Sequence, residues 1–178
     1  QVIRSILEGN EVVAIVAPSF VGQFGRDVTV PKFLTAMKQL GFADVVEVAA
    51  GADICTIEEA HDFLEKVPNE QRFMATSCCP SWRMMARRLF PAESGNISMT
   101  YTPMVYTARL VKKEHPNSKV VFIGPCAAKK LEAMQEDIRT DVDFVLTYEE
   151  LMGIFEAKEI NFSTLPDSPD LDEGTRAG

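Results

Sequence analysis

The chain has 178 residues, of which 46% are hydrophobic and 25% charged, and 26 acidic against 18 basic residues give a formal net charge of −8. This composition fits one globular domain with a substantial core, and the acidic balance without a basic cluster excludes nucleic acid as a partner. The longest apolar stretches are about seven residues, far below the roughly 18 to 20 that span a bilayer, so we expect a cytoplasmic protein with no membrane span.

The hydrophobic pattern alternates between short β-branched runs and amphipathic stretches. Residues 12–18 (VVAIVAP) predict a strand buried on both faces, and residues 31–41 predict a helix that opens with proline and closes with glycine. Further strands are predicted at residues 44–50, 72–77, 119–124 and 143–147, and further helices at 56–67, 80–90, 103–115, from 127 onward and at 148–158. This order predicts an α/β fold with a mostly parallel sheet flanked by helices. The acidic, proline-rich segment 164–178 predicts a loop or a disordered tail.

The four cysteines, at positions 55, 78, 79 and 126, lack the dense spacing of a secreted disulfide framework and favour metal or redox chemistry in a reducing compartment. Cys78 and Cys79 follow one predicted strand and Cys126 follows another. Because ligands bind outside the carboxyl ends of parallel strands, we expect these two loops to converge. Pro80 can begin a helix whose N-terminus stabilises a thiolate, and lysines follow Cys126. The sequence therefore indicates a metal site.

The spacing of the cysteines distinguishes between several other kinds of site. The plain alternative is that Cys78 and Cys79 are small buried hydrophobes at a strand end. A thioredoxin-like site needs two residues between its thiols, and a structural zinc site needs clustered cysteine pairs, which are absent from the sequence. A cysteine nucleophile would need His61 or His115 as base, but both histidines lie in surface-type segments. An iron–sulfur site remains, although it normally takes four cysteines.

The sequence resembles the catalytic domain of the iron-only, or [FeFe], hydrogenases. The first two signature loops of that family are similar to TSCCPSW (76–82) and GPCAAKKLE (124–132). The resemblance runs in the family's order from APS (17–19) through GFADVVEVAAGAD (41–53) and SMTYTP (98–103) to DVDFVLTYEEL (141–151). It implies that residues 1–178 form the N-terminal part of the catalytic domain, one lobe of an α/β fold, with the third cysteine loop beyond Gly178.

The resemblance implies a role for each cysteine of the two loops. Cys79 and Cys126 would be ligands of the [4Fe–4S] part of the H-cluster, the active-site cofactor that also contains a di-iron subcluster. Cys78 would not bind metal but would pass protons to the di-iron unit, a role that suits a thiol because free thiols titrate at about pH 8.5. Lys129 would donate to a cyanide ligand of the di-iron unit.

The resemblance also implies residues along a proton route and around the cofactor. Glu59, Asp62 and Ser98 would lie on the route from solvent, with Asp62 where a glutamate is usual. The plain alternative is solvation on a helix face for the two carboxylates and a cap or turn for the serine. Residues beside the cofactor would be Ala17, Pro18, Ser19, Gly124 and Pro125.

Three positions depart from the family pattern. Ser81 stands where glycine is common, Gly124 where methionine usually precedes the Pro-Cys pair, and Met104 where glutamine is frequent. These departures are expected to line the cofactor pocket and favour a less typical branch, one that senses hydrogen rather than turning it over quickly. Cys55 matches no family ligand and is expected in the core.

The function implied for the intact protein is reversible interconversion of dihydrogen with protons and electrons, which a ferredoxin or another carrier would exchange. With two of four cubane ligands, this fragment is expected to be inactive and to hold an absent or incomplete cluster. One alternative is a non-catalytic hydrogen-sensing or regulatory module. Another is a related iron–sulfur assembly and prelamin-binding protein, against which the Cys78–Cys79 pair argues because that family usually keeps a single cysteine there.

Overall fold

The structure, a computed structural model, describes residues 1–166. Its strands are β1 (Val12–Val16), β2 (Asp44–Glu47), β3 (Lys119–Gly124) and β4 (Phe144–Thr147). Its α-helices are α1 (Val2–Leu7), α2 (Val30–Leu40), α3 (Ala49–Lys66), α4 (Pro80–Leu89), α5 (Pro103–Glu114), α6 (Ala128–Glu132) and α7 (Tyr148–Ala157). Short 3₁₀ turns η1 (Pro18–Phe20), η2 (Pro91–Asn96) and η3 (Phe162–Thr164) complete the described part.

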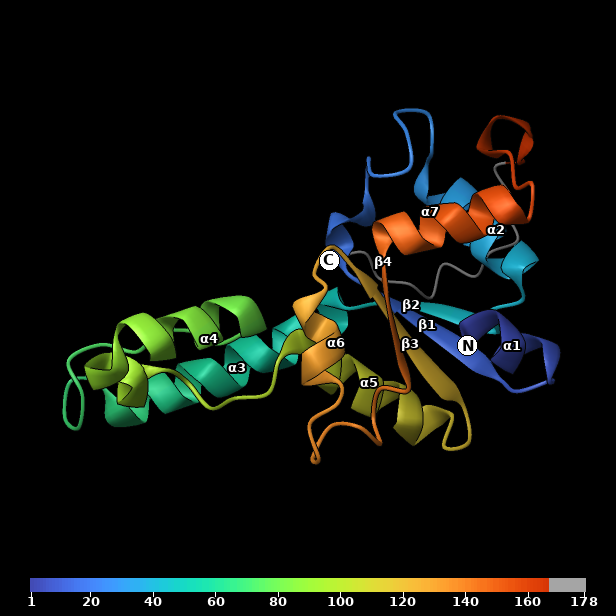
Figure 1. Ribbon diagram of the computed structural model, residues 1–178. Coiled ribbons are helices and arrows are strands. Elements are labelled where there is room, and N and C mark those ends of the chain that lie inside the picture. Colours follow the sequence, from blue (N-terminus) through green and yellow to red (C-terminus); the bar gives the residue numbers. More distant parts are fainter. Residues whose placement is uncertain (167–178) are drawn as a thin grey trace.

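The four strands form a parallel sheet in the order β2-β1-β3-β4, which confirms the predicted α/β architecture (Figure 1). Central strand β1 pairs with β3 so that Val16 lies opposite Ile123, and β3 pairs with β4 so that Gly124 lies opposite Thr147. The carboxyl ends of β1, β3 and β4 therefore reach the same edge of the sheet, where the loops after them can meet.

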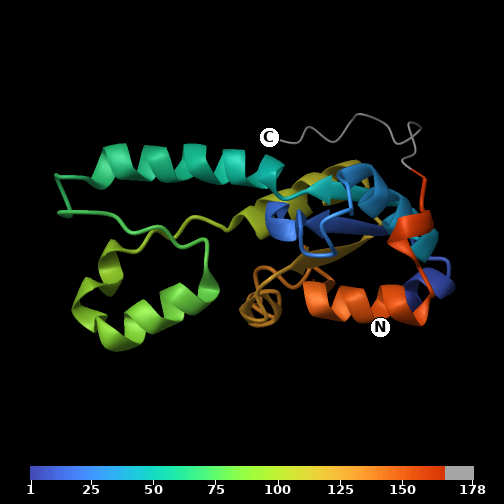
Figure 2. The same ribbon diagram turned by 90° about the horizontal axis from the view of Figure 1, so that it is seen from above.

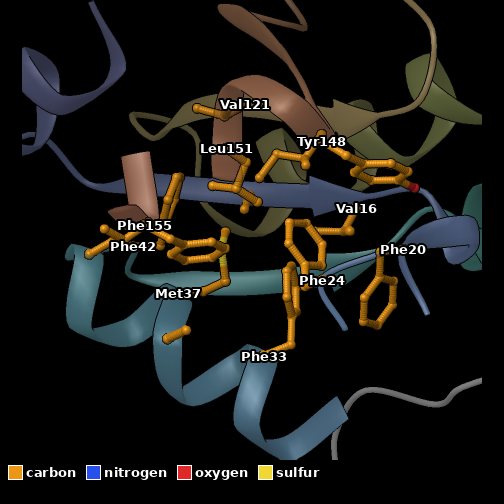
Figure 3. Close-up of a cluster of buried hydrophobic side chains, with 14 of the residues drawn as sticks. Val16, Phe20, Phe24, Phe33, Met37, Phe42, Val121, Tyr148, Leu151 and Phe155 are labelled. Carbon is orange, nitrogen blue, oxygen red and sulfur yellow. The ribbon is translucent and has the colours of Figure 1, made fainter. Parts of the chain in front are cut away.

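The sheet is covered on both faces because alternate residues of each strand point to opposite sides. Val12, Ala14 and Val16 pack with α2 and α7 in one hydrophobic cluster, whereas Val13 and Ile15 pack with α5 in a second cluster. Figure 3 shows aromatic and aliphatic side chains from both covering helices meeting over the first face. All five residues of β1 are at most 1% exposed, as the continuous apolar run predicted.

Helix α3 begins earlier than the sequence pattern predicted. Residues 44–50 were expected as strand and 56–67 as helix, but β2 ends at Glu47 and α3 runs from Ala49 to Lys66. The two alanines that open α3 are strong helix formers, so the apolar run does not continue as strand. Together with α4, this long helix extends beyond the edge of the sheet as a separate arm (Figure 2).

The predicted strand at residues 72–77 is wrong. Ala75 makes an isolated parallel bridge with Ile97, and the rest of the segment is irregular. Phe73 is 46% exposed, so the apolar side chains of this run do not enter the core. The preference of these residues for strand is a local property, whereas a strand forms only where a neighbouring strand supplies hydrogen-bond partners. This segment lies on the α3–α4 arm, away from the sheet, so it lacks such a neighbour (Figure 2).

The predicted tail 164–178 lies largely outside the described residues. Within the described part, Thr164 ends η3 and Leu165 is 9% exposed, packing into the first hydrophobic cluster. Among the helices of residues 1–166, none combines the length and the apolar character that crossing a membrane requires.

Candidate functional site

The loops after β1 and β3 lie side by side at the carboxyl edge of the sheet. The Ala17 amide donates to the Ile123 carbonyl at 2.9 Å, which extends the β1–β3 ladder to the segment 17–19. Tyr148 fixes this segment from the first turn of α7, because its hydroxyl donates to the Ala17 carbonyl at 3.0 Å and lies 2.8 Å from Ser19 Oγ. The sequence did not point to Tyr148 as part of the site, and only its position directly after β4 could have done so.

The loop that carries Cys78 and Cys79 does not follow a strand of the sheet, so the predicted reason for its position was wrong. It lies instead along the segment before α5, where the Ser98 amide donates to the Ala75 carbonyl at 2.8 Å. Ser77 Oγ donates to the Thr100 carbonyl at 3.3 Å. These contacts hold the loop so that Cys79 is the N-cap residue of α4, which begins at Pro80.

Two contacts nevertheless bring the cysteine loops together. Ser81 Oγ, in the first turn of α4, lies 3.9 Å from Cys126 Sγ. Lys129 Nζ, in α6, donates to the Cys78 carbonyl at 3.2 Å. Cys78 and Cys79 are exposed and Cys126 is partly buried. The convergence of the two loops is therefore present, although α4 and α6 produce it rather than two neighbouring strands.

Lys129 and Glu132 form a buried ion pair in this region. Lys129 is 8% exposed, and its ammonium lies 2.6 Å from the carboxylate of Glu132, which is 5% exposed. An ammonium has three N–H donors, and Glu132 and the Cys78 carbonyl engage two of them. Among residues 1–166, no third acceptor engages the Lys129 ammonium. Sequence reasoning missed Glu132, although its spacing of three from Lys129 on a helix was a readable signal.

The three residues expected on a proton route differ in how they contact the cysteine loop. Glu59 Oε1 accepts a long hydrogen bond, 3.4 Å, from the amide of Ser77, the residue before Cys78. Asp62 lies nearly one turn further along α3 and pairs with Lys66 at 3.0 Å. Ser98 is 2% exposed, and its hydroxyl donates to Thr100 Oγ1 at 3.0 Å. Glu59 is thus brought to the cysteine loop, and Ser98 is linked to the same loop through Thr100.

Cys55 is a core residue, as expected. It is 5% exposed, and its thiol donates to the Tyr101 carbonyl at 3.3 Å. Burial, together with the nearby Glu59 carboxylate, raises the pKa of the Cys55 thiol to about 11. The thiol is therefore protonated at neutral pH and a poor metal ligand.

Two of the three departures from the family pattern are explained by packing. A side chain at Gly124 would place its Cβ 2.6 Å from the Phe122 ring and 3.3 Å from the Ala17 Cβ. The Phe122 ring therefore fills the space that a methionine at 124 would need. Met104 is 1% exposed and packs in the second hydrophobic cluster with Val105 and Ala108, so it belongs to the core.

The donor set fits part of an iron–sulfur cluster. Cys79 lies at the positive end of α4 and Cys126 beside it, and thiolates are the usual ligands of iron in such clusters. Within residues 1–166, no three His, Cys, Asp or Glu side chains come together in a group that could hold a metal ion. The described residues could therefore supply two of the four thiolates that a cubane takes.

Known proteins share both the sequence and this fold. Iron hydrogenase 1 of Clostridium pasteurianum is 34% identical over 171 residues, which cover 87% of this chain and 30% of that protein. The nuclear prelamin A recognition factor of Xenopus laevis is 31% identical over 153 residues, covering 75% of this chain and 34% of that protein. A solved structure of an [FeFe]-hydrogenase aligns with a TM-score of 0.82 and 25% identity, covering 93% of this chain and 48% of that chain.

The chain thus spans about a third of the length of these curated relatives. Cytosolic Fe–S cluster assembly factors are also homologous to it. Residues 10–178 match the family described as the iron only hydrogenase large subunit, C-terminal domain. Since this match covers nearly the whole chain, the protein belongs to the iron-only hydrogenase large-subunit family.

Proposed function

We propose that this chain supplies two thiolate ligands, Cys79 and Cys126, to the [4Fe–4S] part of an H-cluster in an iron-only hydrogenase. The observation that carries the proposal is the contact between the two cysteine loops, with Ser81 Oγ 3.9 Å from Cys126 Sγ and only two residues from Cys79. The N-terminus of α4 stabilises negative charge on the Cys79 sulfur. Residues 17–19 and 124–125 would border the cofactor from the sheet edge.

The proposed reaction is the reversible conversion of dihydrogen into two protons and two electrons, with a ferredoxin or another carrier exchanging the electrons. The H-cluster, when bound, supplies the redox chemistry, and this chain's residues handle the protons. Cys78 is exposed and free of the metal in this scheme, so its thiol can take and pass a proton. Glu59 accepts it next, since its carboxylate touches the amide of the preceding residue.

The outer part of the proton route follows helix α3. Asp62 lies three residues after Glu59 on α3, and its side chain pairs with Lys66. Because the Asp62 side chain is 26% exposed, its carboxylate can exchange protons with water. Ser98 hydrogen-bonds to Thr100, whose carbonyl accepts from Ser77, and would thereby position the cysteine loop along the route. Lys129 would use its remaining donor toward the di-iron unit while Glu132 holds the ammonium in place.

The remaining ligands must come from polypeptide outside this chain, because a cubane takes four thiolates and this chain offers two. Its relatives are about three times longer, which leaves room for them. The 178-residue chain alone is accordingly proposed to lack a complete H-cluster and hydrogenase activity.

A second candidate function is iron–sulfur assembly. The nuclear prelamin A recognition factor, at 31% identity, is almost as similar as the hydrogenase at 34%. The adjacent thiols of Cys78 and Cys79 favour a hydrogenase. In the proposed scheme Cys79 binds the cluster and Cys78 relays protons, and a protein that makes no hydrogen needs no such relay. A hydrogen-sensing hydrogenase is the variant that the departures from the family pattern at Ser81, Met104 and Gly124 favour.

The test is hydrogen evolution from a reduced dye by a full-length protein that contains this chain, prepared anaerobically with cluster maturation. Infrared spectra would be recorded on the same sample for carbonyl and cyanide ligands. The hydrogenase proposal predicts both the infrared bands and hydrogen evolution. Bound iron without those bands and without hydrogen would contradict it and favour the assembly function, whereas bands with slow turnover would indicate a sensor.

A further inference from the structure

A cavity of about 280 Å³ lies between α4 and α6, beside the cysteine loops. Arg83 and Arg87 line it from α4, Glu132 and Gln135 from α6 and the turn after it, and Thr102 from the start of α5. The cavity adjoins the cysteine loop, because Ser77 and Pro80 on either side of the Cys78–Cys79 pair also line it, but no cysteine of the described residues does.

The two arginines in this cavity lack strong acceptors. Nη2 of Arg83 and Nη2 of Arg87 both point at Met99 Sδ, at 3.4 and 3.8 Å, and a thioether is a weak acceptor. Arg83 Nε is buried and has no hydrogen-bond partner. Within residues 1–166, neither guanidinium forms an ion pair with a carboxylate. Arg83 is partly buried whereas Arg87 is exposed, so the missing counter-charge is costly mainly for Arg83.

A third polar group in the same cavity is also unpaired. Thr102 is 5% exposed, and its hydroxyl is buried without a partner, although its position before α5 would allow a helix cap. Buried polar atoms are almost always hydrogen-bonded in native proteins, so orphaned donors from two elements at one cavity call for a ligand. Glu132 does not supply the missing acceptor, because Lys129 holds its carboxylate.

We propose that this cavity binds a small oxyanion, of the phosphate or carboxylate class. Guanidinium groups bind such oxygens through paired N–H donors, and the Thr102 hydroxyl would donate a further hydrogen bond. With Glu132 neutralised by Lys129, the two arginines leave the cavity positively charged. The volume of about 280 Å³ admits inorganic phosphate or a short dicarboxylate.

The experiment is isothermal titration of the 178-residue chain with inorganic phosphate and, in a separate arm, with succinate, at constant ionic strength. The variants are Arg87→Gln, which removes one exposed guanidinium, and Thr102→Val, which removes the buried hydroxyl and keeps the side-chain shape. Arg88→Gln is the matched control, because Arg88 neighbours Arg87 on α4 and carries the same charge but does not line the cavity.

Saturable binding to one site is expected for at least one of the two anions. Arg87→Gln should weaken it by about tenfold or more, as for a lost charged hydrogen bond, and Thr102→Val by several-fold. Arg88→Gln should change it less than about twofold. Tighter phosphate or tighter succinate would each support the proposal and identify the oxyanion class. The proposal is overturned if neither anion saturates, or if Arg88→Gln weakens binding as much as Arg87→Gln.

Discussion

The buried pair of Lys129 and Glu132 should contribute far more to stability than an exposed ion pair. Their side chains are 10% and 6% exposed, and the ammonium also holds the Cys78 carbonyl. Replacing either partner alone with methionine leaves a buried charge without its counter-ion, which costs about 3 kcal/mol or more. Replacing both removes the two charges together and should cost only about 1 kcal/mol, mainly for the donor lost to Cys78.

The assay is urea unfolding of the chain, followed by circular dichroism, for both single variants and the double variant. With these costs, the double-mutant cycle should give an interaction energy of about 5 kcal/mol. Lys130→Met is the control, since Lys130 and Glu150 form a pair whose side chains are 41% and 43% exposed and should contribute at most about 1 kcal/mol. The reasoning is refuted if Glu132→Met costs no more than Lys130→Met, or if the single effects simply add.

Three further predictions follow from packing and ionisation. Gly124→Met should destabilise the chain by about 1 to 3 kcal/mol, because the Phe122 ring fills the space that the methionine needs. In the Phe122→Ala variant that space is empty, so the same substitution should stabilise the protein. Thermal melts in which the two substitutions have additive effects would contradict this. Burial opposes ionisation of Asp143, but hydrogen bonds from Lys119, the Val120 amide and Lys112 outweigh it and lower its pKa. Ionised Asp143 therefore stabilises the fold above the ordinary aspartate pKa of about 4, and this stabilisation is lost as the pH falls through the lower pKa of the folded state. Asp143→Asn should flatten the acid limb of a plot of unfolding free energy against pH. Cys55, with a pKa of about 11, should react with a thiol reagent at pH 8 only after unfolding, unlike Cys78; equal rates in the native chain would count against its burial.

Much of the fold could be predicted because its signals are local. The apolar runs at residues 12–16 and 119–124 became the two central strands, and the helix predicted at 31–41 begins and ends within one residue of its place. The strand predicted at 72–77 failed because a strand depends on a neighbour distant in sequence, and the segment lies on the α3–α4 arm.

The site could be predicted only in part. The cysteine motifs indicated convergence, but the contacts that produce it run from α4 to Cys126 and from α6 to the Cys78 carbonyl. Nothing in the local pattern of Phe122 shows that its ring covers Gly124, because that depends on how the strand face packs. Glu132 was readable as a helix-spaced partner of Lys129, yet its burial, which gives the pair its importance, is a tertiary property.

The most direct test of the proposed roles compares Cys78→Ala with Cys79→Ala in a full-length protein that contains this chain, measuring iron content and hydrogen evolution on each sample. Cys79→Ala removes a proposed metal bond, so iron content should fall together with activity. Cys78→Ala removes only the proposed relay, so iron should be retained while turnover falls by about a hundredfold or more. Loss of iron in the Cys78 variant, or undiminished hydrogen evolution with iron retained, would contradict the proposed division of labour between the two adjacent thiols.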